Sequence, residues 1–120
     1  MERRVLVVDD SGFMRKRICE QIKARGHFIA GEAKGGVEAV EMFKAHRPDL
    51  VIMDITMRDM DGITAAREIL TEDPGAKILF LTILTDEKYK VEAKSLGAVG
   101  FVNKTDQASI DKVLEDIDQL

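Results

Sequence analysis

The chain has 120 residues, of which 45% are hydrophobic and 33% are charged, and its formal net charge is −4 at pH 7. This length allows one hydrophobic core, so we expect a single globular domain spanning residues 1–120. Because basic residues are interleaved with acids, the composition disfavours direct binding to nucleic acid. Cys19 is the only cysteine, which excludes an internal disulfide and favours a cytoplasmic protein.

Five short apolar segments alternate with five helix-length segments. The apolar segments are predicted to be strands and comprise residues 4–8, 28–32, 50–53, 77–81 and 99–102. Three of them are apolar on consecutive residues, as strands buried on both faces are. The first run is stopped too early by two aspartates to be a signal peptide, and the longest stretch, residues 78–84, is too short to span a bilayer. We therefore expect no membrane attachment.

The segments between these strands carry helical periodicity. Met14, Ile18 and Ile22 repeat every four residues, which is typical of a helix with one apolar face. The last helix shows the same kind of stripe over residues 110–117. Glycine and proline predict where helices end, at Gly26, Arg47-Pro48, residues 73–75 and Gly97.

Regular alternation of strands and helices predicts an α/β fold of the flavodoxin-like, doubly wound type. Its parallel sheet would carry five helices on its two faces, with right-handed crossovers. For five strands the order 2-1-3-4-5 is common, and ligands then bind beyond the carboxyl ends of the strands, between strands 1 and 3. The residues at those ends are therefore the candidates for a functional site.

Polar residues end four of the five predicted strands. Asp9-Asp10 follow the first strand and Asp54 follows the third, so the predicted order brings three carboxylates together. Such carboxylates repel one another unless a cation lies between them. Mg²⁺ prefers oxygen ligands and needs only one or two carboxylates with waters. The sequence thus predicts a Mg²⁺ site at this edge.

The other two strand ends supply groups that suit an anion. Thr82 offers a hydroxyl and Lys104 a fixed positive charge. A carboxylate surrounded by a metal ion, a lysine and a hydroxyl is suited to phosphoryl transfer, because the reaction depends on positioning and on neutralising the phosphoryl oxygens. The carboxylate of Asp54 would be the nucleophile, since it needs no general base.

Three segments resemble the receiver domain of two-component response regulators, and chemotaxis-type single-domain receivers are the most similar in length. These segments read VLVVDD, DLVIMDITMRDMDG and GAVGFVNK, and the resemblance covers the whole chain. It implies that Asp54 is the phosphoacceptor. It also implies that Asp9, Asp10 and Asp54 bind Mg²⁺ together with the main-chain carbonyl of Thr56.

The same resemblance implies a switch and two protein partners. Thr82 and Lys104 stand at the positions that stabilise the phosphoryl group, and Phe101 stands where the family has a rotating aromatic. A sensor histidine kinase would phosphorylate the domain, and a downstream protein would bind the face formed by helix 4, strand 5 and helix 5. We expect a monomer or weak dimer that is not an enzyme beyond self-phosphorylation and autodephosphorylation.

Several positions depart from the family pattern. Arg58 and Thr105 stand where proline is usual, and Ile83 stands where a small residue is usual. We expect Ile83 and Leu84 to shield the acyl phosphate and lengthen its lifetime.

Each candidate residue also has an ordinary structural interpretation. Asp9 and Asp10 could cap the first helix, and Phe101 could be a core residue. His27 and His46 are expected at the surface. Gly35-Gly36 resembles a phosphate loop only superficially, because the spacing of the known motif is missing.

Three other functions compete with phosphoryl transfer to a receiver. A receiver fold can serve as a phosphorylation-independent docking module, which the departures leave open. A small Mg²⁺ phosphatase with an aspartyl nucleophile would need D-x-D, whereas this chain has Asp54-Ile55-Thr56. A nucleotide or flavin site would place phosphate against Asp9 and Asp10, which repel it.

Overall fold

The structure is a computed structural model that describes residues 2–83, 87–117 and 119. Five strands and five helices alternate along these residues. In chain order they are β1 (Arg4–Val8), α1 (Gly12–Ala24), β2 (Phe28–Ala33), α2 (Gly36–His46), β3 (Leu50–Met53), α3 (Gly62–Glu72), β4 (Ile78–Thr82), α4 (Glu87–Ser95), β5 (Gly100–Asn103) and α5 (Gln107–Ile117).

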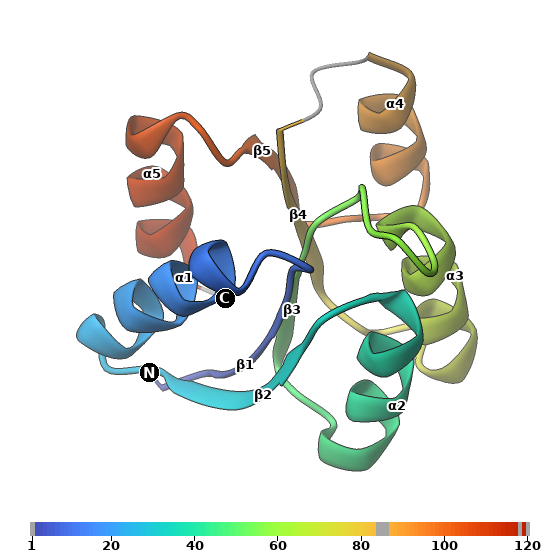
Figure 1. The fold of residues 1–120 in the computed structure, drawn as a ribbon, viewed down its shortest axis with the longest axis horizontal. Coiled ribbons are helices and arrows are strands. Elements are labelled where there is room, and N and C mark those ends of the chain that lie inside the picture. The colour runs from blue at the N-terminus through green and yellow to red at the C-terminus, as the bar shows by residue number, and fades with distance from the viewer. Residues whose placement is uncertain (1, 84–86, 118, 120) are drawn as a thin grey trace.

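The strands form one parallel sheet in the order β2-β1-β3-β4-β5, which confirms the predicted flavodoxin-like topology. Helices α1 and α5 cover one face of the sheet, and α2, α3 and α4 cover the other (Figure 1). Each face has its own hydrophobic cluster. Val5, Val7 and Ile52 pack towards α1 and α5, whereas Leu6 and Met53 pack on the other face. The alternation follows from the period of two along each strand.

Three strands have other boundaries than predicted. β2 extends one residue further than expected, and β4 and β5 each begin and end one residue later. The shift in β4 and β5 brings Thr82 opposite Asn103 in the parallel ladder. Backbone pairing with the neighbouring strand sets these boundaries, and the polarity of the side chains alone does not reveal where that pairing begins and ends.

The predicted helix ends are confirmed. Gly26 and Gly97 have φ angles of 85° and 80°, the left-handed region that favours glycine at a helix C-terminus. Arg47 ends α2 with a φ of 44° and donates its N–H to the carbonyl of Phe43. Pro48 follows, where it cannot continue the helix.

The prediction for His27 was wrong. Its exposed fraction is 5%, and its Nδ1 accepts a hydrogen bond from the N–H of Arg3 at 2.9 Å. The imidazole lies between the chain start and the turn after α1, a contact that the local sequence does not reveal. His46 is exposed, as expected.

None of the helices that the structure describes has the length and apolar character needed to cross a membrane.

Candidate functional site

Three carboxylates meet at the carboxyl edge of the sheet. Asp9 directly follows β1 and donates its N–H to the carbonyl of Ala33, and Asp54 directly follows β3 and donates its N–H to the carbonyl of Val8. These bonds extend the ladder beyond the strands and fix both backbones. One oxygen from each of Asp9, Asp10 and Asp54 lies within 4.8 Å of the others. Asp9 and Asp54 are buried and Asp10 is partly exposed.

Lys104 connects two of these carboxylates. Its Nζ lies 3.0 Å from Oδ2 of Asp9 and 3.1 Å from Oδ2 of Asp54, and the lysine side chain is 8% exposed. Its backbone N–H bonds to the carbonyl of Thr82, which ties the β5–α5 loop to the end of β4. Burial opposes the charge on this amine, but the hydrogen bonds to Asp9 and Asp54 outweigh burial and raise the pKa of Lys104. It therefore remains a cation in this site.

For the carboxyl of Asp54, burial has a larger effect on the pKa than the contact with Lys104. Burial raises its pKa above the ordinary value, more than the hydrogen bond and charge of Lys104 lower it, and Asp9 adds repulsion. One oxygen, Oδ1, is buried and has no hydrogen-bond partner among the described residues. The site thus carries more negative charge than Lys104 compensates.

These residues fit a hard divalent cation. The clustered carboxylate oxygens and the unpartnered Oδ1 of Asp54 are the ligands that Mg²⁺ prefers, and partly exposed Asp10 leaves room for water. Thr56 lies two residues after Asp54 in the β3–α3 loop, on the same side of the sheet edge.

Thr82 is the last residue of β4 and is completely buried. Its hydroxyl interacts with the carboxylate of Asp54 and favours the ionised form, which lowers the pKa of that carboxyl slightly against the effect of burial. The structure thereby places Thr82, Lys104 and the three carboxylates around one point.

Phe101 lies apart from this cluster, in the middle of β5 and opposite Phe80 of β4. It packs on the same hydrophobic cluster as Phe80. Because side chains alternate along strands, Thr82 and Phe101 share the face that α4 covers. Phe101 is partly exposed there, and a cavity of about 190 Å³ separates it from Lys90 and Lys94 of α4.

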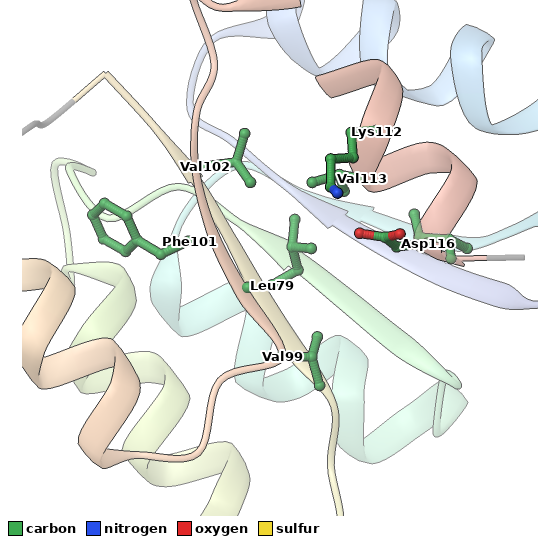
Figure 2. Close-up of a pocket in the computed structure, with 9 residues that line it drawn as sticks. Leu79, Val99, Phe101, Val102, Lys112, Val113 and Asp116 are labelled. Carbon is green, nitrogen blue, oxygen red and sulfur yellow. The ribbon is translucent and has the colours of Figure 1, made fainter. Parts of the chain in front are cut away.

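The opposite side of β5 has a second cavity, of about 280 Å³, between the strand edge and α5. Figure 2 shows that Val102 and Leu79 face Val113 and Asp116 of α5, whereas the ring of Phe101 points away towards the other face. A movement of Phe101 would therefore alter the α4 side of the sheet edge.

The residues that depart from the family pattern lie around this site. Arg58 places its Nε 3.7 Å from Oδ2 of Asp10, and its side chain is 89% exposed. Thr105 donates both its N–H and its hydroxyl to Oδ1 of Asn103, at 2.9 and 2.7 Å. Ile83 is 56% exposed. Leu84 lies outside the described residues.

Three residues that shape the site were not among the residues predicted from the sequence. Ser11, rather than either aspartate, caps α1 by accepting the N–H of Met14. Arg15 donates from Nη1 to the carbonyl of Asp9 at 2.8 Å. Asp59 contacts the start of α2. A serine directly before α1 could have identified the Ser11 cap. The contact of Asp59 joins segments 23 residues apart, and the contact of Arg15 with a main-chain carbonyl depends on the conformation of the β1–α1 loop.

The comparisons agree with this geometry. Residues 5–115 match the response regulator receiver domain family. The chemotaxis protein CheY of Bacillus subtilis is 43% identical over 119 residues, which cover 99% of this chain and 98% of that protein.

Two solved structures are similar over nearly the whole chain. The response regulator domain of Thermotoga maritima CheB superposes with a TM-score of 0.91 at 35% identity and covers 99% of this chain and 96% of that one. CheY in a CheX-CheY-BeF3-Mg complex from Borrelia burgdorferi gives a TM-score of 0.88 at 33% identity, covering 95% and 87%.

Proposed function

Because the chain belongs to the response regulator receiver domain family, we propose that it accepts a phosphoryl group on Asp54 from a phosphohistidine of a sensor histidine kinase. The observation that carries this proposal is the position of Asp54: its buried carboxylate contacts Lys104 and lies beside Asp9 and Asp10 at the sheet edge. Like the CheY proteins it resembles, this domain would serve signalling rather than metabolism.

The chemical step needs few protein groups. An oxygen of the Asp54 carboxylate attacks phosphorus, the bond from phosphorus to the histidine nitrogen breaks, and the imidazole leaves with the electron pair and takes up a proton. Lys104 donates to one phosphoryl oxygen and the Thr82 hydroxyl to another. Both groups already interact with Asp54, so each starts close to the phosphoryl group.

Mg²⁺ would be held by Asp9, Asp10, one oxygen of Asp54 and the main-chain carbonyl of Thr56. The bound ion supplies positive charge beside the phosphoryl oxygens. Oδ1 of Asp9 accepts the N–H of Ser11 at 2.9 Å, and Oδ2 accepts from Lys104. These two bonds keep the Asp9 carboxylate oriented towards the site. Arg58 forms an ion pair with Asp10, so it would have to give up part of this contact when the ion binds the Asp10 carboxylate.

The output of the switch would be the α4-β5-α5 face. Phosphorylation would draw Thr82 towards the new oxygens, and Phe101, on the same face of the sheet, would move inward. Lys88, Lys90 and Lys94 give α4 a basic edge beside Phe101, which suits a protein target with acidic residues. The Borrelia CheY was solved in complex with CheX and the Bacillus relative is a chemotaxis protein, which supports a target in chemotaxis signalling.

Intact mass spectrometry tests the phosphoacceptor directly. The wild-type chain, treated with acetyl phosphate and Mg²⁺, should gain the mass of one phosphoryl group, and Asp54→Asn should gain none. Asp111→Asn, which changes an exposed aspartate of α5, is the matched control and should behave as wild type. A wild-type chain that gains no mass would instead favour a docking module that works without phosphorylation.

A further inference from the structure

Helix α2 receives its N-terminal cap from another part of the chain. Its own N-cap residue is Gly35, which has no side chain to accept a hydrogen bond. Oδ1 of Asp59 accepts the N–H of Gly36 at 3.0 Å, and Oδ2 accepts the N–H of Val37 at 3.2 Å. A carboxylate at the positive end of a helix stabilises the helix, but such caps usually come from the helix's own first residues.

The two glycines at this point are required by the contact. A side chain at Gly35 would overlap the carboxylate of Asp59, and a Cβ on Gly36 would lie 2.6 Å from the carbonyl oxygen of Met60. Glycine at both positions lets the β3–α3 loop lie directly on the start of α2. The pair Gly35-Gly36 therefore accommodates this loop rather than a phosphate.

The same loop carries part of the proposed Mg²⁺ site. The start of this loop is fixed at Ile55, whose carbonyl accepts the N–H of Gly62 at 2.7 Å. A side chain on Gly62 would overlap the main chain of Asp54, so glycine is needed there. The far end of the loop is fixed by Asp59 on α2. Thr56 and Arg58 lie between these two anchors. Arg58 directly precedes Asp59 and reaches Asp10.

We propose that Asp59 is a positioning residue that couples the N-terminus of α2 to the Mg²⁺ site. By holding the loop on α2, it fixes the main-chain carbonyl of Thr56 relative to the three carboxylates. The inference rests on the proposed function only for the presence of Mg²⁺. Coupling is reciprocal, so Mg²⁺ binding should in turn stabilise the first turn of α2.

Calorimetric titration of the whole chain with Mg²⁺ alone tests the coupling. Asp59→Ala should bind Mg²⁺ roughly tenfold more weakly, the size of effect seen when outer-shell partners of a metal ligand are lost. Asp59→Asn, which keeps the shape and one acceptor oxygen, should lose less. Gly35→Ala should weaken binding from the other side of the contact, because its methyl group displaces Asp59.

The double variant separates this role from general damage. Once Asp59→Ala has removed the carboxylate, adding Gly35→Ala should cost little more, because nothing remains for the methyl group to displace. Glu38→Ala is the matched control, since Glu38 lies in the first turn of α2 and accepts the N–H of Lys34, within its own segment. It should leave Mg²⁺ affinity unchanged.

Hydrogen exchange supplies a second measurement. Saturating Mg²⁺ should slow exchange of the Gly36 and Val37 amides in the wild type and leave it unchanged in Asp59→Ala. Wild-type Mg²⁺ affinity in Asp59→Ala, or an equal loss in Glu38→Ala, would overturn the positioning role alone. Normal Mg²⁺ binding without phosphoryl uptake would contradict only the proposed function, and a wild type that binds no Mg²⁺ would contradict both.

Discussion

The Nζ atom of Lys104 lies 3.1 Å from Oδ2 of Asp54, and both side chains are almost completely buried. The same amine lies 3.0 Å from Asp9. One lysine thus contacts two buried carboxylates, so its replacement is the most direct way to change the charge balance of the site.

Replacing this lysine should destabilise the metal-free fold. Lys104→Met keeps the length of the side chain but leaves two buried carboxylates without a cation, which should lower the free energy of unfolding by about 3 kcal/mol. Mg²⁺ should restore more stability to this variant than to the wild type, because it replaces the missing charge. Urea unfolding with and without Mg²⁺ measures both effects. Lys112→Met, which replaces an exposed lysine of α5, is the control, and equal losses in the two variants would contradict the prediction.

The raised pKa of Asp54 predicts a dependence of stability on pH. Burial raises this pKa above the ordinary 3.8, more than Lys104 lowers it. The folded protein therefore holds this proton more tightly than the unfolded chain does, so the stability that the group contributes is present below pH 3.8 and is lost as pH rises through the folded-state pKa.

The Asp54→Asn variant lacks the carboxyl group that titrates in the wild type. In Mg²⁺-free buffer, its free energy of unfolding should rise relative to wild type as the pH is increased from about 4 towards neutrality. Urea unfolding of both proteins at several pH values measures the difference. A difference that stays constant over this range would show that the ionised carboxylate carries no cost in the fold.

The exposed side chain of Ile83 should slow loss of the phosphoryl group. Ile83 directly follows Thr82 at the site edge of β4, where its bulk hinders the approach of water. Ile83→Ala should shorten the half-life of the acyl phosphate by up to tenfold, or about 1.4 kcal/mol of barrier. Mass spectrometry after removal of the phosphodonor follows the decay. Val91→Ala removes an equally exposed side chain from α4 and should have no effect.

Cys19 should be unreactive while the protein is folded. The residue is 5% exposed, and burial raises the pKa of its thiol to about 11, helped by the charge of Glu32. Because the thiolate is the reactive form, a thiol reagent at pH 8 should label the folded chain far more slowly than the chain in concentrated urea. Equal labelling rates would mean that α1 opens easily.

Much of the fold was predictable because each element carries its own signal. The runs at residues 4–8 and 50–53 match β1 and β3, since the buried residues of these strands are apolar on consecutive positions and only the exposed Arg4 is charged. Gly26 and Gly97 marked helix ends through backbone conformation alone. The boundaries of β4 and β5 were displaced by one residue because Thr82 and Asn103 pair across the ladder, although both are polar.

The candidate site was predictable in composition but not in detail. The order of strands places Asp9, Asp10 and Asp54 at one edge whatever their neighbours are, so topology alone identified them. The contacts of Arg58 with Asp10, of Arg15 with the Asp9 carbonyl and of Asp59 with α2 join residues that are distant in the sequence or lie in irregular loops. The burial of His27 was missed for the same reason.

The sequence by itself determined the position of each strand to within one residue, the helices that follow the strands and the polar groups that end four of them, because hydrophobic periodicity and helix-ending residues act over a few neighbours. Only the tertiary structure decided that Lys104 bridges Asp9 and Asp54, and that a carboxylate from the β3–α3 loop caps α2 across Gly35-Gly36. These contacts depend on distances between elements that are fixed by packing, and packing is a property of the whole chain rather than of any segment.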